Sequence, residues 1–262
     1  MLQKNHDQLF SEGPFPEILI QENTTIVGEN HIKTATDPKV EADFQSRLNQ
    51  ARFIVIEHDC LDGNLFSAQS SHPRFMQQAQ EHSLSTGTPL LILDNEIDKD
   101  RYQLWPNTNV DIPREDFYFI LGLHLAIKNF SLQTAPASTL SDLNNFFQNY
   151  FPDKDLCHSM SQSVYQTVFK DTSYQKLDLI TDIILRLTKI DSLAREIYYQ
   201  KRLKGIHQNL SGRNLLVVIG RDHAKPIAET LQNGKITQIE KSQISLLQGQ
   251  LSNLTTPPAS QK

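Results

Sequence analysis

Runs of consecutive β-branched, aliphatic and aromatic residues lie between polar turns near both ends of the chain. Short runs of this kind are typical of strands that are buried on both faces of a parallel sheet. Four of them predict strands, at residues 24–27, 52–56, 90–93 and 215–219. Shorter patterns predict one more strand at 17–20, within an N-terminal arm, and an edge strand that contains Ile236 and Ile239.

The middle of the chain has a different pattern, because its apolar residues recur every three or four positions, as on one face of a helix. The longest such stripe runs from residue 174 to residue 210 and is expected to be core packing. Asp37-Pro38 predicts the start of a helix, with aspartate as the cap and proline in the first turn. Lys225-Pro226 predicts the start of another helix.

These elements predict an α/β fold with a mixed, mainly parallel central sheet. A single domain is expected over residues 1–250, with a large helical insertion at about 113–209. The polar tail at 251–262 is expected to be disordered.

The composition narrows the classes of partner. The 262 residues suffice for a full core, and the net charge of −5 gives no basic face for nucleic acid. No apolar run is long enough to span a bilayer, and the amino terminus lacks the apolar core of a signal peptide. With only two cysteines, we expect a cytoplasmic protein, or an effector secreted without a signal peptide, that acts on a small molecule or a peptide.

Two strands end in the same motif, a glycine followed by two polar residues and a histidine. The first is Gly28-Glu29-Asn30-His31 and the second is Gly220-Arg221-Asp222-His223. Ligands of open α/β sheets bind beyond the carboxyl ends of the strands. Either motif alone is equally well explained by a histidine that caps a turn. The two together indicate one site that contains both His31 and His223.

Acidic residues end two further strands. Glu57 follows the run at 52–56, and a carboxylate buried there needs a partner. Strand alternation points His58 to the opposite face, which favours a capping or surface role for it. Asp94 follows 90–93 and either caps the turn or supports a metal ligand; Glu29 and Asp222 are candidates for the same supporting role.

Two imidazoles and one carboxylate suit two kinds of chemistry. His31, Glu57 and His223 are a ligand set for a divalent metal such as Mn, Co or Zn, with positions left open for water or substrate. The metal would acidify a bound water. Without a metal, Glu57 would orient a histidine that deprotonates water. The sequence leaves both mechanisms open and contains no Gly-x-Ser-x-Gly nucleophile motif.

The order of these motifs resembles one superfamily, which contains the TIKI/TraB metalloproteases, the erythromycin esterases and the ChaN-like haem-uptake lipoproteins. The similarity covers about residues 24–60 and 190–232 and includes the pair Arg195-Glu196 before the second Gly-x-x-His. It implies a polar site at the strand ends of a mixed α/β sheet with a helical insertion. The functional residues it implies are His31, Glu57, Arg195 and His223.

Arg195 has two readings. An ion pair with Asp191, one turn earlier, is ordinary helix-surface stabilisation. In the order of the superfamily, Arg195 would bind a substrate carboxylate or a developing oxyanion.

The resemblance implies hydrolysis of amide or ester bonds, with metal dependence as the leading expectation. The alternatives are a binder of haem or metal without turnover, and an inactive fold that serves as an effector or interaction protein.

Overall fold

The computed structural model describes residues 3–4, 17–29, 37–60, 74–96, 101–108, 112–170, 173–210 and 212–255. The chain divides into two compact units, which are described one at a time. The first contains Met1–Lys99 and Glu196–Thr237, and the second contains Asp100–Arg195 and Gln238–Lys262. Among the described helices, none has both the length and the hydropathy needed to cross a membrane.

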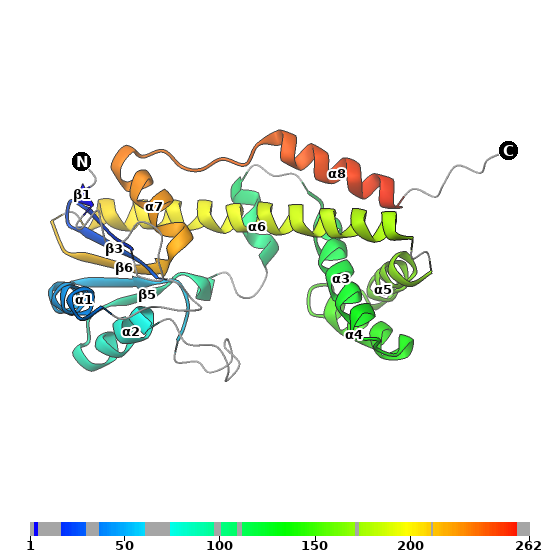
Figure 1. Cartoon of the computed structure of the whole chain (residues 1–262), viewed down its shortest axis with the longest axis horizontal. Coiled ribbons are helices and arrows are strands. Elements are labelled where there is room, and N and C mark those ends of the chain that lie inside the picture. Colours follow the sequence, from blue (N-terminus) through cyan, green and yellow to red (C-terminus); the bar gives the residue numbers. More distant parts are fainter. Residues whose placement is uncertain are drawn as a thin grey trace. The chain divides into compact units, whose positions relative to one another are not determined.

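The first unit is built on a mixed sheet (Figure 1). In the described part of the chain the sheet has six strands in the order β1-β2-β3-β6-β4-β5. The first three are antiparallel neighbours, whereas β3, β6, β4 and β5 are parallel. This confirms the predicted α/β class with a mixed, mainly parallel sheet. The strands are β1 (Gln3–Lys4), β2 (Glu17–Gln21), β3 (Thr24–Glu29), β4 (Phe53–Ile56), β5 (Leu90–Ile92) and β6 (Leu215–Gly220).

The central strand β6 brings the ends of its neighbours to one edge of the sheet. All six of its residues are buried, as expected for a strand covered on both faces. Glu29 of β3 lies opposite Gly220, and Ile56 of β4 lies opposite Val218. The carboxyl ends of β3, β6 and β4 therefore finish side by side, and Glu57 follows directly.

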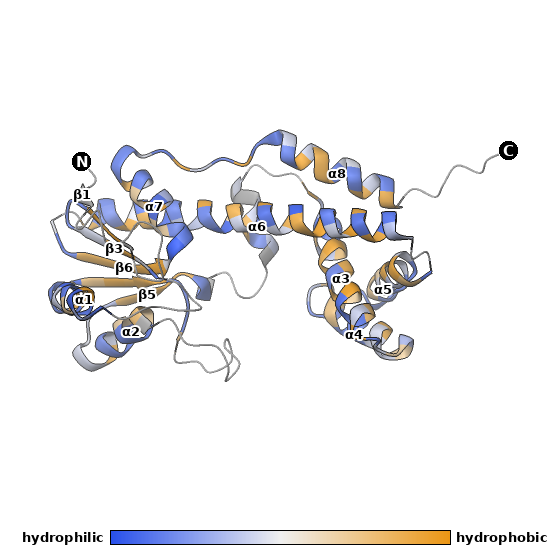
Figure 2. Cartoon of the chain, in the orientation of Figure 1, coloured by the Kyte–Doolittle hydropathy of each residue, from blue (hydrophilic) through white to orange (hydrophobic). Residues whose placement is uncertain are grey.

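Successive strand residues point to opposite faces of the sheet. Both faces carry apolar side chains, and helices bury them. Val27, Ile54 and Val218 pack in one core cluster with Phe44 of α1 (Pro38–Gln50) and Met76 of α2 (Arg74–Thr86). The helix α7 (Arg221–Asn233) packs on β2, β3 and β6. Figure 2 shows the hydrophobic strands beside helices that carry both hydrophobic and hydrophilic residues. Asp37 caps α1 as predicted, its carboxylate accepting from the Lys39 amide at 2.8 Å.

The second unit is helical in its described part. It contains the 3-10 segment η2 (Arg101–Thr108) and the helices α3 (Arg114–Ser131), α4 (Pro136–Gln148), α5 (Lys154–Phe169) and α8 (Lys241–Thr255). The long helix α6 (Tyr174–Asn209) contributes its first part to this unit and Glu196 onwards to the first unit. The core is aromatic: Tyr118 contacts Phe117 edge-on at 5.1 Å and stacks on Tyr150 at 4.0 Å between ring centroids.

Four sequence predictions differ from the structure. The segment 234–240, predicted to contain an edge strand, has no strand. The helix α7 begins at Arg221 and not at Lys225, so Pro226 lies inside it. The helix α8 continues to Thr255, into the tail predicted from residue 251, because Leu251 and Leu254 are buried. The boundaries of the second unit also differ from the expected insertion at 113–209.

A glycine allows α7 to lie close to β3. A Cβ atom on Gly28 would be 2.7 Å from the Ala224 Cβ and 3.1 Å from the Arg221 Cα. Both neighbours belong to the first turns of α7, and neither can rotate away. The absence of a side chain at residue 28 therefore sets the depth at which α7, and with it His223, meets the sheet.

We expect Gly28→Ala to destabilise the protein by about 1–3 kcal/mol, because the added methyl overpacks a rigid contact. Gly205→Ala is the matched control: Gly205 lies in α6 with open space around its Cβ position. That change should stabilise by about 0.5–1 kcal/mol through helix propensity. Denaturant unfolding of both variants checks this, and equal effects of the same sign would contradict the packing argument.

Candidate active site

Glu57 lies at the centre of a cluster at the carboxyl edge of the parallel strands. Its side chain is 3% exposed. The Gly220 amide donates to Oε2 at 2.5 Å, and His58 Nε2 is 3.2 Å from Oε1. The backbone amide of Glu57 donates to Val218 at 3.2 Å, which extends the β4–β6 pairing by one residue. Residue 57 is thus fixed by backbone and side chain alike.

His223 approaches the same carboxylate from the first turn of α7. Its Nε2 is 3.9 Å from Glu57 Oε1, and its Nδ1 is 3.7 Å from Glu196 Oε2 on α6. The Tyr199 ring meets the imidazole edge-on, with 5.4 Å between centroids. The structure therefore brings Glu57 and His223 together, as the strand pattern predicted.

Of the other predicted residues, Glu29 has a structural contact and His31 is not described. His31 lies outside the described residues, so its convergence with His223 stays a prediction. Glu29 ends β3 and is buried; its carboxylate accepts from the Phe75 and Met76 amides at 2.9 and 3.0 Å, which anchors the amino end of α2.

Two more predicted residues, Asp222 and Arg195, lie on the helices α7 and α6. Asp222 is exposed in the first turn of α7. Arg195 is partly buried on α6 in the second unit, and its functional role stays a prediction.

Asp94 is part of the cluster. It begins the short 3-10 segment η1 (Asp94–Glu96), and its amide donates to the Glu57 carbonyl at 3.0 Å. One carboxylate oxygen, Oδ2, is 2.5 Å from His58 Nδ1, and the other, Oδ1, accepts from the Tyr199 hydroxyl. Asp94 therefore connects β5 to α6 through a charged hydrogen-bond network.

The predicted surface or capping role of His58 is wrong. β4 ends at Ile56, and Glu57 and His58 lie in a bend where strand alternation no longer applies. The His58 side chain is 15% exposed and lies between Glu57 and Asp94. Burial by itself would lower the pKa of His58, but hydrogen bonds and charge from both carboxylates outweigh it and raise the pKa to about 9. His58 is therefore an imidazolium at neutral pH.

Together these groups form a row in which carboxylates and imidazoles alternate. The order is Tyr199, Asp94, His58, Glu57, His223 and Glu196. Sequence reasoning missed Tyr199, and it named Glu196 only as a member of the Arg195-Glu196 pair, because the stripe of α6 was assigned to core packing. A signal was present: Glu196 and Gln200 place two polar side chains one turn apart beside the apolar residues Ala194 and Ile197.

The described donors fit a proton network better than a metal site. Both oxygens of Glu57 face protein donors, and one of those donors, His58, carries a positive charge where a cation would have to approach. Among the residues that the structure describes, no group of three or more His, Cys, Asp or Glu side chains is arranged to hold a metal ion. His31, the third predicted ligand, lies outside the described residues, so the metal site stays a prediction.

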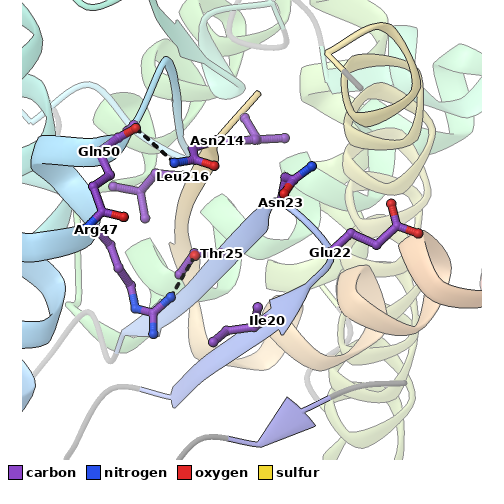
Figure 3. A pocket seen from close by; sticks show the side chains of 10 residues that line it. Ile20, Glu22, Asn23, Thr25, Arg47, Gln50, Asn214 and Leu216 are labelled. Carbon is purple, nitrogen blue, oxygen red and sulfur yellow. Dashed lines mark hydrogen bonds between the residues drawn. The ribbon is translucent and has the colours of Figure 1, made fainter. Parts of the chain in front are cut away.

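A cavity of about 130 Å³ lies in the same unit, at the opposite ends of the parallel strands (Figure 3). It is near the amino ends of β3 and β6, where Arg47 Nη1 donates to Thr25 Oγ1 at 3.1 Å. Because parallel sheets bind ligands at the carboxyl ends of their strands, we place the candidate active site at Glu57 and not in this cavity.

No protein-family model, curated protein or solved structure matches this chain.

The raised pKa of His58 predicts how stability depends on pH. The folded protein holds this proton up to about pH 9, whereas the unfolded chain releases it near pH 6.5. The stabilisation is therefore complete below pH 6.5 and is lost as the pH rises through 9; a shift of this size corresponds to about 3 kcal/mol.

Urea unfolding of wild type and His58→Gln between pH 6 and pH 9.5 measures this effect. The stability of the wild type relative to the variant should fall across that range. A difference that stays constant with pH would show that His58 is neutral in the folded protein.

Proposed function

We propose that this chain is a hydrolase of amide or ester bonds in which His223 acts as general base beside Glu57. The observation that carries the proposal is the pair of facing atoms His223 Nε2 and Glu57 Oε1, 3.9 Å apart at the carboxyl edge of the sheet. This separation is too long for a direct hydrogen bond. It suits a water molecule that donates one proton to each atom.

The chemistry requires an ionised Glu57, and its surroundings favour that form. The Gly220 amide and the His58 imidazolium both interact with the carboxylate, and hydrogen bonds of this kind stabilise the charged form. An ionised Glu57 would orient the water and offset the positive charge that forms on His223.

The proposed reaction is direct attack by water. His223 Nε2 accepts one proton from the water while the oxygen forms a bond to the substrate carbonyl carbon. The tetrahedral intermediate then breaks its bond to the leaving amine or alcohol, which receives the proton from His223. The products are a carboxylic acid and the released amine or alcohol, and the base is regenerated without a redox partner.

This mechanism favours the metal-free alternative over the metal-dependent one. A metal at Glu57 would compete with the Gly220 amide and the His58 imidazolium for the same oxygens. The proposed substrate class, small esters and peptides, is common to both alternatives. They differ in their response to a chelator.

We expect turnover on a panel of esters and peptides to survive EDTA, and His223→Ala to lower kcat by about 10²–10⁴-fold through loss of the base. Glu57→Gln should also lower kcat while the protein remains folded. His124→Ala is the matched control, since His124 is an exposed histidine on α3, and it should leave turnover unchanged.

Other results would overturn the proposal in distinct ways. Turnover lost to EDTA and restored by Mn, Co or Zn would establish the metal mechanism. An inert wild type with a bound haem spectrum or stoichiometric metal would indicate a binder. An inert wild type free of both would indicate an effector or interaction protein.

A further inference from the structure

We propose that Glu196 is the positioning residue of His223: its carboxylate accepts the Nδ1 proton and so leaves Nε2 as the basic nitrogen. The inference rests on the proposed function only in naming His223 as the base. Glu196 would act through the imidazole and need not touch the substrate.

The first observation is the surroundings of His223 Nδ1. This atom is buried and has no hydrogen-bond partner among the residues that the structure describes. The nearest ionisable group recorded for it is Glu196 Oε2, at 3.7 Å. A buried N–H without a partner destabilises the folded state. A small approach of the carboxylate would satisfy it, and catalytic hydrogen bonds are often long before substrate binds.

The second observation is that Glu196 is itself held in place. Its Oε1 accepts from the Thr237 hydroxyl at 2.8 Å and from Gln200 Nε2 at 3.3 Å. Gln200 also binds Thr237 twice, accepting from its amide at 2.7 Å and donating to its hydroxyl at 2.8 Å. Glu196, Gln200 and Thr237 form the Glu196 clamp. The hydrogen bonds of the clamp end on Oε1, and Oε2 is the oxygen that lies near His223.

The geometry selects one tautomer. Among the described residues, Glu57 lies near Nε2 of His223, Glu196 lies near Nδ1, and the Tyr199 ring is edge-on to the imidazole. If Nδ1–H is donated to Glu196, the lone pair on Nε2 can accept a proton from water. In the other tautomer, Nε2–H would point at Glu57 and the basic nitrogen would be the buried Nδ1. A carboxylate behind an imidazole fixes the tautomer and stabilises the imidazolium in the same way as in catalytic triads.

The test is the tautomer of His223 in the full-length protein, read from ¹⁵N chemical shifts of histidine-labelled samples with the ring neutral. We expect the Nδ1–H form in wild type and a mixture of the two forms in Glu196→Ala. Glu196→Gln keeps the size of the side chain, and its amide can donate to Nδ1, so the Nε2–H form should increase. Glu229→Ala removes an exposed acid from the same helix as His223 and should leave the tautomer as in wild type.

Kinetics supply the second readout. On a substrate that wild type cleaves, Glu196→Gln should lower kcat by about 10²-fold or more with little change in KM. If wild type cleaves nothing, the proposed function fails, but the tautomer measurement still decides the role of Glu196. A folded Glu196→Gln variant with the wild-type tautomer would overturn the inference. Thermal unfolding of each variant confirms that the fold is retained.

Discussion

The arrangement of the site depends on one buried charge, the carboxylate of Glu57. A charge in the interior is tolerated only with close partners, and the chain supplies them from elements that are distant in sequence. The end of β6 contributes the Gly220 amide, the bend after β4 contributes His58, and the start of α7 contributes His223. Satisfying this carboxylate therefore draws the ends of two strands and the start of a helix to the same point.

The backbone of the first unit makes that convergence possible. Parallel pairing of β4 with β6 fixes the height of Glu57 relative to Gly220. Because α7 begins without an intervening loop, His223 lies within one turn of the strand end. The missing side chain at Gly28 lets α7 approach β3 closely enough for this to happen. The position of His223 thus follows from strand register and backbone packing as well as from its own contacts.

The sequence predicted these elements well where burial is complete. Strands such as β6 are apolar along their whole length, so the continuous run of apolar residues marks their position in the sequence. The predictions failed at positions that strand alternation and helical periodicity do not determine. His58 was assigned to the wrong face because alternation was assumed beyond Ile56, where the strand stops. Tyr199, and the contact of Glu196 with His223, were missed because periodicity shows which face of α6 is buried and not which distant residue it will meet.

The charge balance of the row bears on the two chemistries that the sequence left open. A metal ion at Glu57 would have to replace the interaction with His58, whose pKa is about 9. The positive charge of His58 would repel a cation that approached the same carboxylate. The proposed proton mechanism leaves the interaction between His58 and Glu57 in place. The same ion pair that makes the buried Glu57 tolerable therefore supports the proposal that His223 activates water.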